Sequence, residues 1–391
     1  MPPTDKKILS IFGTRPEAIK MAPVIRALEQ TPGIKSLVAV TAQHREMLDQ
    51  VLTLFKIEPD FDLNIMKPGQ DLFEITSGIL LGLRGVFERS KPDLVLVHGD
   101  TTTCTAAALA AFYQEIPIGH VEAGLRTGDL RAPFPEEANR SIVSRIASMH
   151  FAPTNTSKKN LLAENINEKI IWVTGNTVID ALLSVRNTIH DHNPYDWLTL
   201  PNKTVKAIEN IPEKLILITG HRRENFGQGF IDFCAALIKI AEHNPRWLLV
   251  YPVHLNPNVQ KPVFDLLQNA RNIHLIPPQE YLPFTWLLDS CDLVITDSGG
   301  IQEEAPSLGK PVLVTRAVTE RPEAVDAGTV ILVGTNPNTI ADQAVDILTN
   351  NTRYAAMSEA HNPYGDGHAA QRIVDAILEF KIPKKTKPAP F

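Results

Sequence analysis

Cysteine is scarce in this sequence, with 3 among 391 residues. Cys104, Cys234 and Cys291 are far apart, and each lies in an apolar context. An odd number of widely spaced cysteines predicts neither a disulfide framework nor a cysteine metal site. We expect buried thiols in a reducing compartment, and therefore a cytoplasmic protein.

The sequence also lacks a long apolar run and a long basic run. No stretch approaches the roughly 18 apolar residues of a membrane-spanning helix, and the segment from Met1 to Lys7 is polar. The formal net charge is −6 and there is no long basic run, which argues against a nucleic-acid partner. We expect a small-molecule ligand and no membrane contact.

The common cofactor fingerprints are incomplete. The turn at Gly13 lacks the second glycine and the Lys-Ser/Thr of a P-loop, and Gly227-Gln228-Gly229 lacks the rest of a dinucleotide fingerprint. Scattered residues such as His98 and His120 show no metal-ligand spacing. The sequence therefore predicts no metal and no nicotinamide cofactor.

Short apolar runs alternate with helical patterns along most of the chain, which predicts parallel sheets made of βαβ units. With 391 residues, 43% of them hydrophobic, the chain is long enough for two cores. The first set of strands is expected at Ile8 to Phe12, Leu37 to Val40, Leu94 to Val97, Ile116 to Ile118 and Ile171 to Val173. The second is expected at Leu215 to Ile218, Trp247 to Tyr251, Ile273 to Ile276, Leu293 to Ile295 and Val312 to Val314, with helices such as Phe230 to Ala241 and Asn336 to Leu348.

A polar, proline-containing segment from about Asn187 to Pro212 interrupts this rhythm and predicts a connector. We therefore expect two Rossmann-like α/β domains, over residues 1–186 and 187–366. A helix is expected at Gly367 to Phe380. The tail that follows, residues 381–391, is rich in Lys and Pro and is expected to be disordered.

The strand predicted at Leu293 to Ile295 leads into a glycine turn. Ser298, Gly299 and Gly300 stand where a helix would begin, so backbone N–H groups can face a phosphate. Glu304 lies about one turn further along, where a carboxylate can accept hydrogen bonds from ribose hydroxyls. An ordinary glycine-started βα turn is the alternative interpretation.

Charged residues follow the predicted strands of the first half, at the sheet edge where such folds bind ligands. They are Arg15, Lys20, Asp100 and Glu122, and a helix expected to start at Pro135 adds Glu136 and Glu137 in its first turn. Solvated cations beside a capped helix are the alternative interpretation of Arg15 and Lys20. Asp100 can also be interpreted as a helix N-cap. Either Glu136 or Glu137 can also be interpreted as an acid that compensates the helix dipole. Glu122 has neither, and an acid that follows a buried strand is costly unless it is paired or used.

The second half places cations at its strand ends. His221, Arg222 and Arg223 follow one strand and Arg321 follows a later one, which favours contact with phosphate. The segment Pro277 to Phe284 offers an aromatic ring that can stack on a base, although Phe284 is explained more simply as a core residue.

Nine motifs, in order along the chain, resemble those of the non-hydrolysing UDP-N-acetylglucosamine 2-epimerases of bacteria and archaea. They are FGTRPEAIKMAP, TAQHREMLDQ, VHGDTTT, HVEAGLRTGD, PEEANR, TGHRREN, YPVHLNPN, DSGGIQEEAPSLGKPVL and TERPEAV. The resemblance runs from about Lys7 to Phe380. It implies a glycosyltransferase B-type architecture: two Rossmann-like doubly wound domains facing a cleft, the C-terminal helix completing the first domain.

The same resemblance implies site residues and an assembly. The substrate-site positions are Arg15, Lys20, Asp100, Glu122, His221, Gln279, Phe284, Ser298, Gly299, Gly300, Glu304 and Arg321. Those tied to catalysis are Asp100, Glu122, Glu136 and His221. A neighbouring site for an activating substrate molecule comprises Gln43, His44, Gln70, Arg222 and His254. A homodimer and a role in supplying surface polysaccharide precursors are also implied.

The implied activity is reversible epimerisation at C2 of UDP-N-acetylglucosamine to UDP-N-acetylmannosamine. C2 has no adjacent carbonyl carbon to stabilise a carbanion, so direct deprotonation is implausible. Elimination of UDP to a glycal and re-addition after protonation of the opposite face avoid that difficulty. Glu122 with Asp100 or Glu136 could serve the two faces. The cations Arg15, His221 and Arg321, with the helix start at Ser298, could stabilise the departing pyrophosphate.

Three other functions fit parts of the pattern. They are a UDP-sugar-dependent glycosyltransferase of the same architecture, a hydrolysing 2-epimerase, and a sensor that binds a nucleotide sugar without turnover. The three candidate carboxylates favour proton transfer at a sugar carbon over the first and the third. The QHR and HRREN stretches weigh against the hydrolysing enzyme by resemblance.

Overall fold

The computed structural model describes residues 5–42, 45–67, 69–191, 200–210, 212–222 and 225–381. Contacts along the chain divide it into two compact units. Unit 1 comprises Met1–Ala181 and Tyr364–Phe391, and unit 2 comprises Leu182–Pro363. The boundary predicted at residue 186 lies inside helix α7 (Thr177–Asp191).

Unit 1 contains a parallel sheet of seven strands in its described residues, in the order β3-β2-β1-β4-β5-β6-β7. The order changes direction at β1, which is the doubly wound arrangement. The strands are β1 (Lys6–Phe12), β2 (Ile34–Val40), β3 (Phe61–Asp62), β4 (Leu94–His98), β5 (Ile118–Val121), β6 (Met149–Ala152) and β7 (Ile171–Val173).

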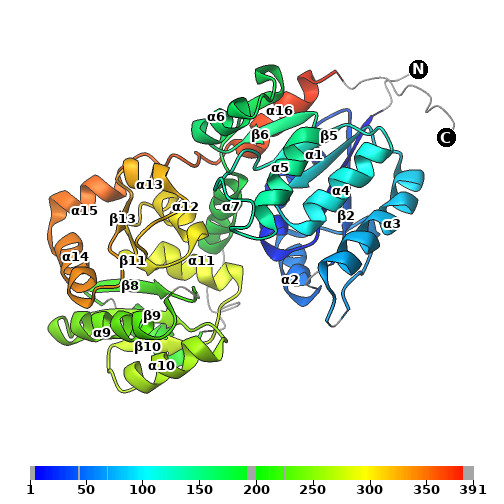
Figure 1. Cartoon of the computed structure of the whole chain (residues 1–391). Coiled ribbons are helices and arrows are strands. Elements are labelled where there is room, and N and C mark those ends of the chain that lie inside the picture. The colour runs from blue at the N-terminus through cyan, green and yellow to red at the C-terminus, as the bar shows by residue number, and fades with distance from the viewer. Residues whose placement is uncertain are drawn as a thin grey trace. The chain divides into compact units, whose positions relative to one another are not determined.

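Helices flank this sheet (Figure 1). They are α1 (Arg15–Glu29), α2 (Arg45–Phe55), α3 (Leu72–Ser90), α4 (Thr102–Tyr113), α5 (Glu136–Ile146), α6 (Asn155–Ala163), α7 and α16 (Ala369–Glu379). Helix α16 packs against α1, so the C-terminal end of the chain returns to unit 1. Helix α4 is rich in buried alanine, and these small side chains let it lie against α3, β1 and β4.

Unit 2 repeats the plan with a parallel sheet in the order β10-β9-β8-β11-β12-β13. Its strands are β8 (Lys214–Thr219), β9 (Trp247–Pro252), β10 (Ile273–Ile276), β11 (Leu293–Thr296), β12 (Val312–Val314) and β13 (Val330–Leu332). Its helices are α8 (Asn202–Glu209), α9 (Gln228–His243), α10 (Pro257–Leu267), α11 (Tyr281–Ser290), α12 (Gly299–Ser307), α13 (Pro322–Asp326), α14 (Pro337–Thr349) and α15 (Asn351–Ser358).

The central strands of each sheet are buried because helices pack against them. Every residue of β4 and β11 is buried, as expected for parallel strands with near-continuous apolar sequence. Side chains of α9, α10 and α14 pack on the unit 2 strands in one core cluster, and side chains of α3 and α4 do so in unit 1. None of the described helices is long and apolar enough to cross a membrane.

Most of the predicted strands are confirmed, but one is displaced. The strand predicted at Ile116 to Ile118 is β5, Ile118–Val121. Pro117 has no N–H to donate to a sheet hydrogen bond, so the strand begins only after it. The strand then continues through His120, which is buried although histidine is not an apolar residue type. Strands β3, β6 and β13 were not predicted; β3 has only two residues, and His150 interrupts the apolar run of β6.

The predicted helices are confirmed within two residues as α9, α14 and α16. The predicted connector is partly helical, since α7 extends to Asp191 and α8 occupies Asn202–Glu209. The amphipathic pattern of α8 is hard to recognise in the sequence because the residues around it are polar. The remainder of the connector, and nearly all of the tail expected at 381–391, lie outside the described residues.

Candidate active site

Glu122 directly follows β5 in unit 1, and its φ of +62° is uncommon for a residue with a side chain. Its side chain is 8% exposed and forms an ion pair with Lys20 of α1. The side-chain amide of Asn176 also donates to Glu122 Oε2 at 2.9 Å, and His98 Nε2 lies 3.9 Å from the same oxygen. Lys20 and Asn176, from two distant segments, therefore offset the cost of burying this acid.

Asp100 lies beyond the end of β4, the neighbour of β5 in the sheet. Its carboxylate accepts two hydrogen bonds from the Arg140 guanidinium, at 2.6 and 3.0 Å. The N-cap of α4 is Thr101, whose hydroxyl accepts the Cys104 N–H. The interpretation of Asp100 as an N-cap is therefore wrong, and its charge is used in the ion pair.

The two adjacent acids at the start of α5 have different surroundings. Glu137 Oε1 accepts the backbone N–H groups of Thr127 and Gly128, both at 3.0 Å, and Glu137 Oε2 accepts from Arg140 at 2.8 Å. Glu136 Oε2 is buried and has no hydrogen-bond partner among the described residues. Glu137 thus holds the loop before α5, which leaves Glu136 as the candidate for chemistry.

Glu17 is a buried acid that the sequence analysis did not select. Its carboxylate accepts the backbone N–H groups of Gly13 and Thr14 and the hydroxyls of Thr14 and Thr101. Burial raises the pKa of Glu17, and these four hydrogen bonds partly oppose that change. Glu17 ties the loop after β1 to the loop after β4, so it fixes the frame in which Lys20 and Asp100 stand.

Three buried histidines lie on neighbouring strands of unit 1. His120 pairs with His150 in the β5–β6 register, and His98 ends β4. Burial lowers the pKa of His98 and of His120 to about 4 and that of His150 to about 3. These imidazoles are neutral at pH 7, so Lys20 is the charged partner of Glu122.

In unit 2, helix α12 begins at Gly299, with Ser298 as its N-cap, as the sequence predicts. No acidic side chain lies in its first turn, so the positive end of the helix dipole is not compensated there. The Ser298 N–H donates to Thr296 Oγ1 at 2.9 Å, which fixes the turn. Glu304 lies one turn inside the helix, where Tyr281 Oη donates to its Oε2 at 3.2 Å.

Asp297, 1% exposed, organises the loop that carries His221. Its carboxylate accepts the N–H groups of His221 and Arg222, both at 2.9 Å to Oδ2. The His221 ring stacks on that of His254, with centroids 5.3 Å apart. Burial lowers the pKa of His221, helped by His254 and Arg222 and opposed by Asp297. His221 is therefore neutral at pH 7 without a ligand, whereas the sequence analysis counted it among the cations.

The other predicted residues of unit 2 are placed as follows. Arg321 pairs with the buried Glu303, and a β-carbon built on Gly299 would lie 3.7 Å from Arg222 Nη2. Gln279 donates its amide to the carbonyl of Pro277 at 2.7 Å, and Phe284 is half-buried on α11. The described residues contain no group of His, Cys, Asp and Glu side chains that could hold a metal.

A family model described as UDP-N-acetylglucosamine 2-epimerase matches residues 26–378 of this chain. The UDP-N-acetylglucosamine 2-epimerase of Salmonella typhimurium is 57% identical over 381 residues, covering 96% of this chain and 99% of the relative. The chain belongs to the UDP-N-acetylglucosamine 2-epimerase family.

Solved structures of the epimerase family share this fold. The Neisseria meningitidis UDP-GlcNAc 2-epimerase bound to UDP-GlcNAc matches with a TM-score of 0.84 and 52% identity, covering 96% of this chain and all of that one. The Methanocaldococcus jannaschii epimerase in complex with UDP-GlcNAc and UDP matches with a TM-score of 0.76 and 35% identity, covering 95% and 99%. The predicted α/β class, two doubly wound domains of glycosyltransferase B-type architecture, is confirmed.

Unit 1 brings together some of the residues expected for an epimerase site. It joins Lys20 to Glu122 and places Asp100 at the end of the next strand. Gln43 and His44, expected at the activator site, lie outside the described residues. Arg140, Asn176, Tyr281 and Asp297 were not selected from the sequence. Asn176 follows β7, so applying the strand-end rule there as well would have found it.

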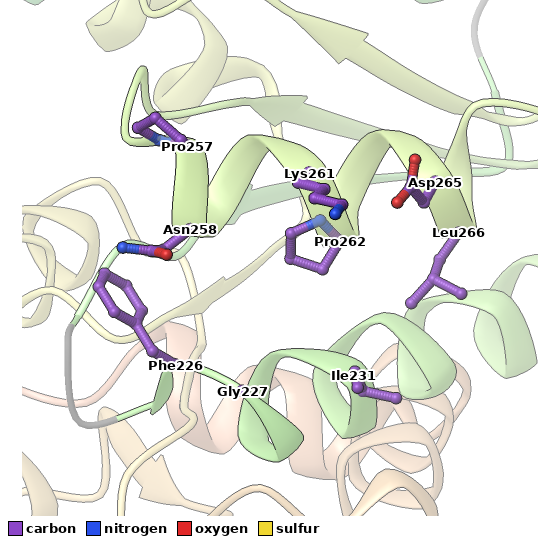
Figure 2. Close-up of a pocket in the computed structure, with 9 residues that line it drawn as sticks. All are labelled: Phe226, Gly227, Ile231, Pro257, Asn258, Lys261, Pro262, Asp265 and Leu266. Atoms are coloured by element: carbon purple, nitrogen blue, oxygen red, sulfur yellow. The ribbon is translucent and has the colours of Figure 1, made fainter.

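Unit 2 also contains a pocket of about 400 Å³ between α9 and α10 (Figure 2). It is lined mainly by apolar side chains, with Lys261, Asp265 and Asn258 among them. The site residues expected for an epimerase are not among the described residues that line it. This pocket is therefore not part of the polar site at the strand ends.

Proposed function

We propose that this protein is an isomerase that interconverts UDP-N-acetylglucosamine and UDP-N-acetylmannosamine at C2, without hydrolysis. The observation that carries the proposal is Glu122, a buried carboxylate at a strand end that is held by Lys20 and Asn176. Such a group can take a proton from a sugar carbon and return one. The family membership and the solved relatives bound to UDP-GlcNAc supply the substrate class.

The reaction proceeds by elimination and re-addition. The C2–H bond and the bond from C1 to the UDP oxygen break, a glycal forms, and UDP stays bound. A proton is then delivered to the opposite face of C2 as UDP re-adds to C1. Glu122 serves one face, and Asp100 or Glu136 serves the other. Asp100 is ion-paired with Arg140, whereas the buried Glu136 Oε2 has no donor among the described residues.

Unit 2 is the UDP-binding unit in this proposal. The N-terminus of α12 and the cations Arg222 and Arg321 meet the pyrophosphate, and Glu304 accepts the ribose hydroxyls. Arg15 of unit 1 adds a cation. A neutral His221 gains a proton more readily once the phosphate charge lies beside it, so binding raises its pKa. These donors stabilise UDP as its charge develops on leaving.

One experiment separates the candidate activities. The purified protein is incubated with UDP-N-acetylglucosamine in deuterium oxide, and the anomeric proton region is followed by NMR. We expect UDP-N-acetylmannosamine with deuterium at C2. Free N-acetylmannosamine would indicate a hydrolysing epimerase, no reaction would indicate a binding protein, and product without solvent deuterium would contradict the proton path.

The activator site belongs to the same proposal. Gln70 is fixed in a loop of unit 1, where its amide donates to the Ile65 carbonyl at 2.7 Å, and His254 stacks on His221 in unit 2. A substrate molecule bound at Gln43, His44, Gln70, Arg222 and His254 activates only through different affinity for two states of the protein. Rates should rise sigmoidally with UDP-N-acetylglucosamine. Conversion of UDP-N-acetylmannosamine alone at a rate unchanged by traces of the other epimer would contradict activation.

A cytoplasmic homodimer that supplies surface polysaccharide precursors completes the proposal. The three cysteines are buried free thiols, which suits a reducing compartment. Light scattering of the purified protein tests the dimer. Loss of a surface polymer on gene deletion, restored by the active gene and not by a Glu122→Gln copy, tests the role.

A further inference from the structure

Asn176 lies between β7 and α7 and donates to the same Glu122 oxygen as Lys20. It is 2% exposed, and its Nδ2 donates to Glu122 Oε2 at 2.9 Å. Its Oδ1 accepts the Val178 N–H at 3.0 Å, at the start of α7. Because an amide oxygen is needed for that second bond, the amide has one orientation, and Nδ2 faces the carboxylate.

The backbone around Asn176 is fixed by the chain as it returns to unit 1. The Asn176 N–H donates to the Tyr364 carbonyl at 2.6 Å, and Tyr364 is the first residue of the returning segment. Gly175 has a φ of +90°, and a β-carbon there would lie 3.5 Å from the backbone of Gly365. Asp180 accepts the N–H groups of Ala369 and Ala370, at 3.2 and 2.8 Å, which fastens α7 to α16.

We propose that Asn176 is a positioning residue for Glu122, and that residues 364–370 hold Asn176 in place. The inference rests on the proposed function, because it concerns the acid–base role assigned to Glu122. Lys20 reaches the same oxygen at the end of a flexible four-carbon stem, and the ammonium can follow a ligand. The amide is fixed at both ends, so it keeps the carboxylate in one orientation when Lys20 moves.

Among the described residues, the charged and titratable groups that face Glu122 come from four elements. They are Lys20 on α1, His98 on β4 and, further away, His120 on β5 and Cys104 on α4, whose pKa is raised by burial so that the thiol is neutral at pH 7. Both imidazoles are neutral at pH 7, and Asn176 has no charge to lose. As a pure donor at this contact, Asn176 favours ionised Glu122 at every pH. Its removal must therefore move the acidic limb of the pH profile upward.

The test compares Asn176→Ala and Asn176→Asp with the unmodified protein over pH 5–9, using kcat/KM for epimerisation. Loss of one hydrogen bond to a charged group should move the acidic limb of the Ala variant up by about 1 pH unit. In the Asp variant a second carboxylate faces Glu122, and two such groups share a proton, so the shift should be larger. UDP affinity should change little in either variant.

Asn272→Ala is the matched control. This amide also lies in a loop and donates to the carbonyls of Ala241, Asn244 and Trp247, but it contacts none of the candidate site residues among the described contacts. We expect lower thermal stability and an unchanged pH profile. The contrast separates positioning of Glu122 from a general loss of stability.

An unshifted profile in both Asn176 variants would overturn this inference and leave the proposed function standing if Glu122→Gln is inactive. Full activity of Glu122→Gln would overturn the acid–base assignment itself. If Asn176→Ala does not fold, the inference is tested with Asn176→Asp and with a second measurement, the titration of the Glu122 carboxyl by NMR. In protein with 13C-labelled glutamate carboxyls, the resonance missing from Glu122→Gln should titrate at higher pH in the Asp variant, and an unchanged midpoint would contradict the inference.

Discussion

The two units share a sheet topology, but the groups at their strand ends differ: paired acids in unit 1, and N–H donors and cations in unit 2. In unit 1 the first turn of α1 carries the acid Glu17, and the loops after β4 and β5 carry Asp100 and Glu122, each matched by donors. In unit 2 the loops after β8 and β11 present backbone N–H groups and cations. Their buried acid, Asp297, is satisfied by the backbone of the His221 loop.

This difference shows how one fold divides two tasks. A carboxylate is useful for proton transfer where neighbours control its charge, which requires buried pairs such as Lys20 and Glu122. A phosphate instead requires fixed hydrogen-bond donors, such as the N–H groups in the first turn of α12. The comparison predicts that substitutions in unit 1 change turnover or the frame of the site, and that substitutions in unit 2 change binding.

The largest effect is expected for Glu122→Gln. Loss of an acid–base group should lower kcat by about 10²- to 10⁴-fold, since the amide keeps the shape and cannot exchange the proton. UDP affinity, measured by calorimetry, should stay nearly the same. Glu242→Gln, an exposed position on α9, is the control for the chemical change. A parallel loss of UDP affinity in Glu122→Gln would break the division between the units.

Glu17→Ala should come next, as a loss of stability in unit 1. It leaves the buried N–H of Gly13 and its neighbouring donors without their acceptor. We expect the free energy of unfolding to fall by about 3 kcal/mol, measured in urea. Glu29→Ala, at the exposed end of the same helix, should change it little. Equal stability of the two variants would mean that Glu17 does not hold the loops together.

Glu304→Ala tests the binding task of unit 2. Loss of hydrogen bonds between a carboxylate and ribose should weaken UDP by about 1–3 kcal/mol, measured by calorimetry. Tyr281→Phe removes only the hydroxyl that donates to Glu304, so its effect should be smaller. Glu359→Ala, exposed in the same unit, is the control. Unchanged UDP affinity in Glu304→Ala would remove the ribose assignment.

The smallest effect is expected for Glu320→Gln in unit 2. Burial opposes ionisation of Glu320, but Arg316 and Arg222 lower its pKa to about 2. A lowered pKa stabilises the fold at pH values above the ordinary 4.5, and this stability is lost as the pH falls toward 2. The side chain is 37% exposed, so screening keeps the cost below about 1 kcal/mol at pH 7.

Urea unfolding at pH 7 and at pH 3 checks the sign for Glu320. The difference between the unmodified protein and the Gln variant should shrink at the lower pH. A difference that grows on acidification would show that Glu320 is not stabilised as a carboxylate. Either result leaves the assignments in unit 1 untouched, because Glu320 contacts only unit 2 residues among the described ion pairs.

Periodicity predicted the class of fold because buried parallel strands and amphipathic helices repeat over short, local windows. It displaced β5, which contains His120, and it missed β6, which contains His150, and the short strands β3 and β13. The strand-end rule found Asp100 and Glu122 because it uses only chain position. It could not exclude Asp100 as an N-cap, since Thr101 stands next to it and only backbone geometry shows which residue caps α4.

The sequence by itself determined the family, the two-unit α/β plan and the helix start at Ser298, because each depends on residues close together in the chain. The tertiary structure alone decided the partners of the acids. Glu122 meets Lys20 and Asn176, which are 102 and 54 positions away, and Asp100 meets Arg140, which is 40 positions away. The order of the strands and the packing of the helices bring these residues, which are far apart in the sequence, into contact. A charge is paired by whatever the neighbouring strand and helix bring within about 3 Å, and no local pattern encodes that neighbour.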